Sequence, residues 1–212
     1  MTTLLLSFLL ACSSEIDNKP AASVSEVEKP SSTAKAEATP QGAPHSDLPP
    51  AKGTTLPIVN SSTVEFVGAK VTSDHTGGFK RISGNAVVGE DGSLLAIDAQ
   101  IDMTSIFSDN ERLTKHLRNE DFFAVDTYPT AKFSARSFEK TEGSTQVKGN
   151  LTLRGVTKEI SFAATTASTP TSASINAEFT INRQLWGVSY PGKPDNLIKD
   201  DVLIKLNVSY GG

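Results

Sequence analysis

Apolar and polar residues alternate along most of the chain from about residue 54 onward. In the clearest run, Ile97, Ala99 and Ile101 fall on one side while Asp98 and Gln100 fall on the other. A period of two predicts β-strands, and strands with one apolar face and one polar face are typical of antiparallel sheets. The breaks between the runs are rich in Gly, Asp and Asn, which favour turns.

The pattern predicts about eight strands, a number that fits a closed up-and-down barrel. They cover residues 64–70, 79–88, 94–103, 131–138, 145–153, 158–165, 175–181 and 202–208, while residues 73–78 are predicted to form a turn. A barrel of this size is either filled by side chains or holds one ligand. Small residues on the predicted inner face allow both interpretations, because they leave room for a slender apolar molecule or fit the taper of a filled barrel. They are Ala99, Gly149, Ala164 and Ala177.

The period changes between residues 104 and 133. Ser108 followed by Glu111 has the form of a capping box, which predicts that a helix begins at Asp109, between the third and fourth strands. Leu113 and Leu117 form an apolar stripe on this helix. The fold prediction is therefore an all-β, eight-stranded antiparallel barrel over residues 54–212, with one short helix across one end.

Ionisable groups gather in and after the predicted helix, where Asp109, Arg112, His116 and Asp121 lie close together in sequence. One interpretation is that His116 acts as a general base oriented by an acid. The other is that these groups cap the helix and tie it to the barrel rim. We favour the second because no Ser, Cys or Lys nucleophile stands at a recognisable spacing, so no enzyme activity is predicted.

Other kinds of chemistry find little support in the sequence. His75 and His116 could share a metal ion, but no third ligand is recognisable, so no metal site is predicted. No glycine-rich loop of the phosphate-binding type is present, and no cofactor is predicted. A formal net charge of −4 offers no basic face for nucleic acid.

Residues 4–10 form a short apolar run that ends just before Cys12, the only cysteine of the chain. The run is too short to span a bilayer and resembles a bacterial lipoprotein signal, in which the cysteine is lipidated and becomes the mature N-terminus. The alternative is an ordinary signal peptide with an incidental cysteine, and residues 1–3 lack the basic charge that signals normally carry. We predict a lipoprotein-type signal over residues 1–12, attachment to a membrane through Cys12 and a location in the cell envelope. Ser13 after the cysteine favours the outer membrane.

Residues 13–53 differ in composition from the rest of the chain. They hold six of the eleven prolines, many Ala, Ser, Lys and Glu, and no aromatic residue. Such a segment buries too little apolar surface to offset its ordering entropy. It is predicted to be a disordered linker that holds the barrel off the membrane surface.

Six sequence blocks occur in order along residues 56–210: DHTGGF at 74–79, TSI at 104–106, HLRNEDF at 116–122, YPTAKF at 128–133, GNLTLRGVTK at 149–158 and INRQLWG at 181–187. In this order and spacing they resemble the YceI-like family of secreted bacterial barrels. The resemblance implies a lipocalin-like barrel whose apolar lumen holds a long lipid, such as a polyisoprenoid or an isoprenoid quinone. Many members carry an Arg-Asp pair where this chain has Leu113-Thr114. Either Arg112 takes the place of that arginine from the preceding position, or the contact is absent.

The resemblance makes the inward-facing apolar residues the expected contacts of a bound lipid. Arg112, His116 and Arg183 are the expected head-group contacts, and Trp186 either helps Arg183 to hold the head group or packs under a loop. The expected partners are the long-chain lipid and the membrane. Two alternatives stay open: an enzyme acting on such a lipid through His116, and a filled barrel serving as a scaffold lipoprotein. The expected lumen and rim contacts are Phe79, Ile101, Leu113, Leu117, Phe122, Phe123, Phe133, Val147, Leu151, Phe162, Phe179 and Trp186.

Overall fold

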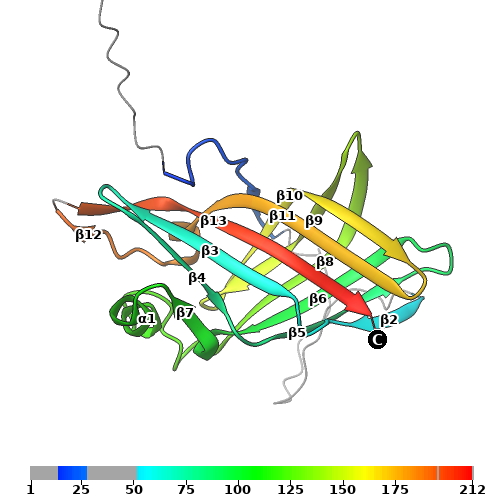
Figure 1. Cartoon of the computed structure of the whole chain (residues 1–212), viewed down its shortest axis with the longest axis horizontal. Helices are drawn as coiled ribbons and strands as arrows, with labels where there is room; N and C mark the ends of the chain where they lie inside the picture. The colour runs from blue at the N-terminus through cyan, green and yellow to red at the C-terminus, as the bar shows by residue number, and fades with distance from the viewer. Residues whose placement is uncertain (1–13, 28–51, 195, 212) are drawn as a thin grey trace, which may run out of the picture.

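The computed structural model describes residues 14–27, 52–194 and 196–211. These residues form a strongly curled sheet of thirteen strands, one α-helix and two short 3-10 helices (Figure 1). Every pairing between the named strands is antiparallel, so the prediction of an all-β antiparallel fold with one helix is confirmed. The elements are β1 (Ser23–Glu26), β2 (Thr54–Pro57), β3 (Thr63–Lys70), β4 (Asp74–Phe79), β5 (Ile82–Val88), β6 (Leu94–Asp102), η1 (Met103–Ser105), β7 (Ile106–Ser108), α1 (Glu111–Arg118), β8 (Thr130–Thr141), β9 (Ser144–Leu153), β10 (Val156–Thr169), β11 (Ser172–Asn182), η2 (Arg183–Trp186), β12 (Gly192–Lys193) and β13 (Asn196–Gly211).

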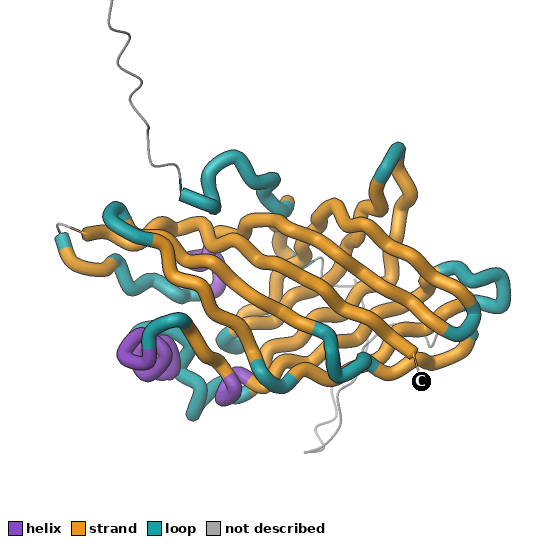
Figure 2. The backbone as a smooth tube through the Cα atoms, in the orientation of Figure 1, coloured by secondary structure: helices purple, strands orange, loops and turns teal. Residues whose placement is uncertain are grey.

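Neighbouring strands follow the order β2-β5-β6-β8-β9-β10-β11-β13-β3-β4-β7. The strands from β8 to β11 follow one another through short turns, as expected for an antiparallel meander. The sheet curls so far that Ile58, just after β2, forms a β-bridge with Tyr210 near the end of β13. The result is a curled half-barrel (Figure 2).

The number of strands is where the fold prediction is wrong, because the described residues form thirteen strands rather than eight. The predicted strand over 79–88 is interrupted after Phe79, and the predicted turn over 73–78 is the strand β4. Gly77 gives the physical reason. A Cβ on Gly77 would lie 2.4 Å from the backbone oxygen of Phe107 and 2.4 Å from the ring of Phe66. The glycine therefore permits close packing of β4 between β3 and β7 rather than a turn.

The helix α1 lies where the sequence predicted a helix, but its N-terminal cap is different. Asn110 is the cap, and its side-chain oxygen accepts a hydrogen bond from the backbone N–H of Leu113 at 3.0 Å. Ser108, the predicted cap, instead donates from its hydroxyl to the backbone oxygen of Asn110 and contacts the Thr114 hydroxyl at 2.9 Å. The capping box with Glu111 is therefore wrong, although the helix itself is present.

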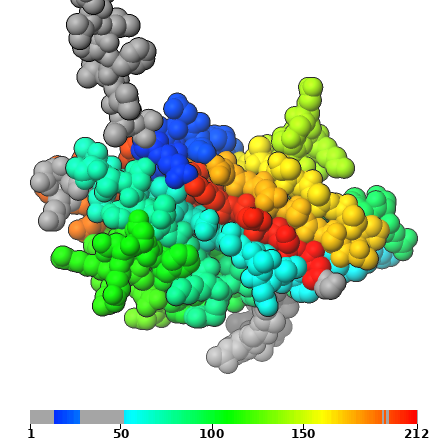
Figure 3. All heavy atoms as spheres, in the orientation of Figure 1, coloured from blue at the N-terminus to red at the C-terminus, as the bar shows by residue number. Residues whose placement is uncertain are grey.

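Residues 14–26, which we call the N-terminal strap, lie on the outside of the sheet. The strap begins at Ser14, buries Ile16 against Val67, Ala69 and Leu203, and ends in β1. In Figure 3 it appears as the blue segment covering part of the surface beside β13. The predicted disordered linker over 13–53 is therefore wrong for residues 14–27. Residues 1–13, with Cys12 and the predicted signal, and residues 28–51 lie outside the described residues.

The strap also completes the sheet where two strands diverge. The strands β10 and β11 pair only between residues 165–169 and 172–176. Along the rest of β10, β1 takes the place of β11 and pairs residues 23–26 with 158–161. Ala21 forms a parallel bridge with Thr180 of β11. The strap thus lies between β10 and β11 and satisfies backbone groups that the gap would leave unpaired.

The apolar core follows the inner face of the curled sheet. The largest cluster joins residues of β5, β6, β8, β9, β10, β11 and β13. A second cluster lies under the helix and is formed by Phe66, Ile106, Leu117, Phe122 and Val188. Among the described residues, no helix has the length and apolar character needed to cross a membrane.

Candidate ligand cavity

The inner face of the sheet surrounds a cavity of about 230 Å3. Its walls are built by the alternation seen in the sequence, because every second residue of a strand faces inward. On β13, for example, Val202, Ile204, Leu206 and Val208 all line the cavity. Nearly all of the lining side chains are apolar, so the cavity suits a hydrocarbon rather than a polar ligand.

The cavity extends along most of the length of the strands. On β13 its lining runs from Ile198 to Tyr210, twelve residues apart, which at about 3.3 Å per residue corresponds to roughly 40 Å of strand. A strand tilt of about 40° reduces this to roughly 30 Å along the cavity. That length is close to the full hydrocarbon thickness of a bilayer, about 30 Å, and so about twice the reach of one acyl chain in a leaflet.

The two ends of the cavity differ. We call the end at α1 and the turn between β3 and β4 the mouth, and the end at Ile58 and Tyr210 the floor. Aromatic rings lie between them. The rings of Phe162 and Phe179 stack with centroids 4.1 Å apart, and Phe133 lies 5.9 Å from Phe162. Such rings give an apolar channel a fixed, narrow width.

Polar lining groups lie only near the ends, among the cavity residues that the structure describes. Lys70, His75 and Arg183 are at the mouth, and Tyr210 is at the floor. The Tyr210 side chain is buried, and this burial, followed by the negative charge of Asp98, raises the pKa of its hydroxyl. The floor therefore carries a neutral phenol at physiological pH.

The Arg183 side chain makes its polar contacts with other groups of the protein. Its guanidinium donates to the backbone oxygens of Val188, Ile198 and Lys199, and it forms an ion pair with Asp200 at 3.4 Å. Burial lowers the pKa of Arg183, and the charge of Asp200 partly opposes this effect. The arginine therefore holds the irregular start of β13 in place, and few of its donors remain for a ligand head group.

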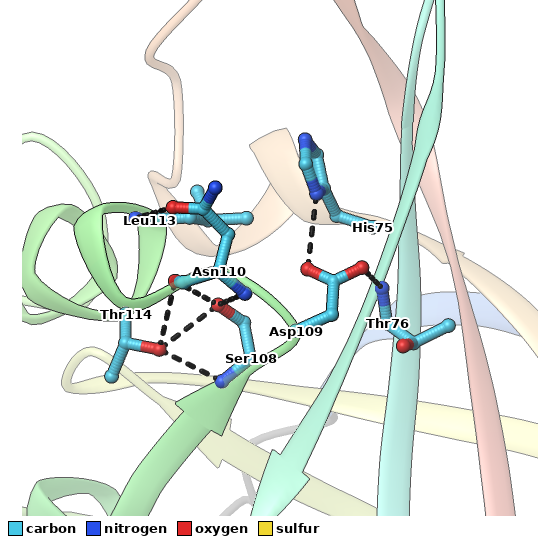
Figure 4. A network of polar contacts seen from close by, with 7 residues as sticks. All are labelled: His75, Thr76, Ser108, Asp109, Asn110, Leu113 and Thr114. Carbon is cyan, nitrogen blue, oxygen red and sulfur yellow. Dashed lines mark hydrogen bonds and ion pairs between the residues drawn. The ribbon is translucent and has the colours of Figure 1, made fainter.

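The helix closes part of the mouth through its apolar side. Leu113, Leu117, Phe122 and Phe123 all line the cavity from α1 and the turns that follow it. Polar contacts fasten the helix at its beginning (Figure 4). The Nδ1 atom of His75 lies 3.0 Å from one carboxylate oxygen of Asp109, whose other oxygen accepts a hydrogen bond from the backbone N–H of Thr76 at 3.1 Å.

A second polar pair fastens the end of the helix. The Nε2 atom of His116 lies 3.3 Å from a carboxylate oxygen of Asp121. The imidazole packs edge-on against Phe122 and Tyr190, with ring centroids 4.9 and 4.8 Å apart. His116 does not line the cavity, so its surroundings are those of a residue that ties the helix to the neighbouring segment.

Eleven of the twelve predicted lumen and rim residues line the cavity. The exception is Trp186, which is fully buried and donates from its indole N–H to the backbone oxygen of Leu151 at 3.2 Å. Of the three predicted head-group residues, only Arg183 borders the cavity. Arg112 is exposed on the helix, away from the lining residues. The proposed lipid contacts stay predictions, but their shared position around one cavity is observed.

Several lining residues were not predicted from the sequence. Val188 and Ile198 belong to a Gly- and Pro-containing stretch without alternation, and Tyr210 lies almost at the chain end. His75 also lines the cavity, whereas the sequence suggests it only as a metal ligand. Within the described residues, no group of three or more His, Cys, Asp or Glu side chains could hold a metal ion.

Comparison with known proteins agrees with this architecture. The chain matches the model of the YceI-like domain over residues 58–210. A UPF0312 protein of Pseudomonas putida is 32% identical over 116 residues, which cover 51% of this chain and 60% of that protein. The match thus spans less than two thirds of the length of this relative.

Two solved structures share the fold. BcnA of Burkholderia cenocepacia aligns with a TM-score of 0.62 at 21% identity, over 70% of this chain and 95% of that one. A polyisoprenoid binding domain from Saccharophagus degradans, implicated in plant cell wall breakdown, aligns with a TM-score of 0.61 at 16% identity, over 76% of this chain and 99% of that one. At these identities the likeness concerns the fold alone.

Proposed function

The chain belongs to the YceI-like domain family, and on that premise we propose that it binds a long apolar lipid inside the curled sheet. The proposed ligand is of the polyisoprenoid or isoprenoid quinone type. The protein sequesters or carries this lipid as a lipoprotein of the cell envelope, anchored through Cys12, with the outer membrane preferred. The single observation that carries the proposal is the apolar cavity that extends from the helix to Tyr210.

Burial of hydrocarbon supplies the affinity. Each 100 Å2 of lipid surface removed from water contributes about 2.5 kcal/mol, without any specific polar contact. A cavity roughly twice as long as one acyl chain favours a longer chain such as a polyisoprenoid over an ordinary fatty acid. The proposal also implies loose selectivity for the head group, because Arg183 is already hydrogen-bonded to the protein and Arg112 is exposed away from the cavity.

The binding element in this proposal is the lipocalin-like half-barrel of thirteen described strands, with the cavity along its inner face.

Gly68 offers a direct test of the cavity. It lies on β3, lines the cavity, and a Cβ placed there would meet no atom within 4 Å. Gly68→Leu should therefore place an apolar side chain in the cavity with free space around its Cβ, and replacing a strand glycine is expected to cost no stability. Asn207→Leu, on the exposed face of the neighbouring strand β13, is the matched control.

The measurement is organic extraction of each purified protein followed by mass spectrometry, with uptake of added isoprenoid as a second readout. Wild type and Asn207→Leu should carry or take up lipid, and Gly68→Leu should lose most of it while its thermal unfolding stays unchanged. Absence of lipid and of uptake in wild type would favour the scaffold alternative. A His116→Ala variant that binds lipid but loses turnover of it would favour the enzyme.

A further inference from the structure

We propose that the mouth of the cavity is a membrane-docking surface, held against a phospholipid leaflet by the N-terminal strap. The proposal rests on the proposed lipidation of Cys12 and deepens the proposed function by naming the surface that meets the membrane. It replaces the expectation of a long tether, because the strap precedes residues 28–51 and is already fixed to the sheet.

The beginning of the strap is fastened close to the mouth. The hydroxyl of Ser14 lies 2.9 and 2.8 Å from the two carboxylate oxygens of Asp74, and the backbone N–H of Glu15 donates to the same carboxylate at 2.9 Å. Asp74 is the first residue of β4, directly after the turn at the mouth. Two residues of chain reach at most about 7 Å, so an acyl group on Cys12 must enter a membrane near this turn.

The rest of the strap prevents this attachment point from drifting. Ile16 is 6% exposed and packs on Val67, Ala69 and Leu203, which face outward from the sheet. Asp17 pairs with Lys199 at 2.7 Å, and Glu15 pairs with Lys205. Each exposed pair contributes little alone, but the buried isoleucine and the pairing of β1 with β10 fix the direction of the strap.

Exposed apolar side chains gather at the same end. Val71 is 74% exposed and Leu197 is 50% exposed, and they are neighbours because the Val71 backbone N–H donates to the Leu197 oxygen at 3.2 Å. Of the five large apolar residues that are exposed in the described part of the chain, only Val59 lies at the floor end. The others, all in or beside turns at the mouth end, are Val71, Val156, Leu185 and Leu197.

These side chains are too few to bind a membrane alone, but in this proposal they act together with the acyl anchor. Burial of a few single Val and Leu side chains gives only weak binding for a protein free in solution. A covalent acyl anchor raises the effective concentration of the leaflet, so a weak second contact is enough to fix orientation. Lys70, which lines the mouth beside Val71, adds attraction to anionic lipids.

Docking of the mouth has a consequence for ligand transfer. A long isoprenoid that leaves the cavity through water exposes its whole apolar surface, at a cost that grows with its length. With the mouth at the leaflet, the chain moves from hydrocarbon to hydrocarbon. The leaflet is then both the surface that holds the protein and the source or acceptor of its ligand.

The test uses the full, acylated chain in vesicles of phosphatidylethanolamine and phosphatidylglycerol. A cysteine is introduced as Val71→Cys or, at the floor end in the exposed turn between β8 and β9, as Glu142→Cys. The chain has one native cysteine, and acylation blocks it, so an environment-sensitive fluorophore labels only the new site. A nitroxide lipid should quench the label at position 71 several-fold more than the label at position 142.

Ile16→Asp in the Val71→Cys background tests the strap itself. Undocking should reduce quenching at position 71 to the level at position 142, while circular dichroism and the acyl mass at Cys12 stay unchanged. If Ile16→Asp prevents folding, Asp17→Lys serves instead, because it replaces the ion pair with Lys199 by two repelling positive charges, and a smaller decrease is expected.

The outcomes separate this proposal from lipid binding. Equal quenching at the two positions in the wild-type background, or no acyl group on Cys12, would overturn membrane docking. Lipid found in the same samples by extraction would then leave the binding proposal intact. Strong quenching at position 71 that Ile16→Asp removes, in a protein without bound lipid, would support docking and count against binding.

Discussion

The helix and the N-terminal strap both lie against the same sheet, but they are fastened in different ways. The helix turns its apolar side to the cavity and is fastened at its two ends by the pairs His75–Asp109 and His116–Asp121. The strap lies on the outer face, buries Ile16 and adds a strand to the sheet. Movement of the helix requires that its polar contacts break and that Leu117 leaves the apolar cluster beneath it, whereas movement of the strap also requires the loss of strand pairing.

This difference reverses the expectation from composition. The strap belongs to a segment rich in Pro, Ala, Ser and charged residues, which predicts disorder, yet it is part of the sheet. Disorder depends on whether a partner surface exists, and here the diverging strands β10 and β11 provide one. We infer that the strap is a fixed part of the wall and the helix is the movable part.

The largest expected effect is the loss of stability caused by a substitution in the strap. Ile16→Ala should lower the free energy of unfolding by about 2–4 kcal/mol, because it removes a buried side chain from the outer-face cluster. Denaturant unfolding of the purified chain measures this. Glu15→Ala, at an exposed neighbouring position, is the control and should cost at most about 1 kcal/mol. Equal, small effects of both substitutions would mean that the strap is not part of the folded wall.

The ion pairs of the strap predict its dependence on pH. The hydrogen bond from Lys199 lowers the pKa of Asp17, and the hydrogen bond from Lys19 lowers the pKa of Glu178. A lowered carboxyl pKa gives stabilisation that is fully present above the unfolded pKa values, about 3.9 for Asp and 4.3 for Glu, and is lost as the pH falls through the folded values. The strap should therefore loosen in acid.

At alkaline pH the strap is expected to lose stabilisation as the pH rises, because the titrating group is a lysine. The hydrogen bond to Glu15 raises the pKa of Lys205, so its stabilisation is present below the unfolded value of about 10.4 and is lost as the pH rises through the folded value. Hydrogen exchange of residues 14–26 should thus be slowest between about pH 5 and 10, after correction for the intrinsic rate. Protection that does not change below pH 4 would show that the carboxylates do not help to hold the strap.

The polar contacts of the helix predict that Asp109→Ala changes the rate of lipid release but has little effect on the free energy of unfolding. Asp109→Ala removes the partner of His75 and of the Thr76 backbone N–H, both at partly exposed positions. The free energy of unfolding should fall by at most about 1 kcal/mol. Release of bound isoprenoid to acceptor vesicles should become several-fold faster. A stability loss as large as that of Ile16→Ala would contradict the assignment of the helix as the movable part.

Most of the site prediction came from the alternation of apolar and polar residues, because the period of a strand determines which residues share a face. Leu151 and Phe162 could be assigned to the inner face of the sheet from this period, and the resemblance to the YceI-like family made that face the expected lipid cavity. The prediction failed where the period does not apply. Gly77 resembles a turn residue, but its function is close packing against Phe107 and Phe66.

The hydrogen-bond partners of individual side chains could not be predicted from the sequence either. Arg183 and Trp186 stand together in the sequence as plausible contacts of a head group, yet their donors are used by backbone oxygens from distant strands and turns. These partners depend on the irregular path of residues 187–200, which has no periodic pattern. Tertiary hydrogen bonds of this kind require the fold to be known first.

The smallest expected effect concerns Arg112, the exposed arginine that precedes Leu113-Thr114 on the helix. Arg112 is exposed on the helix and does not border the cavity, so Arg112→Ala should change the free energy of unfolding by less than about 0.5 kcal/mol. Lipid uptake should also stay unchanged. Arg118→Ala is the comparison, because the Arg118 guanidinium donates to the backbone oxygen of Ile106 at 3.2 Å and ties the helix to β7. Faster lipid release from Arg112→Ala than from Arg118→Ala would mean that Arg112 contacts the ligand when the helix moves, and that the movable helix, rather than the wall, selects the head group.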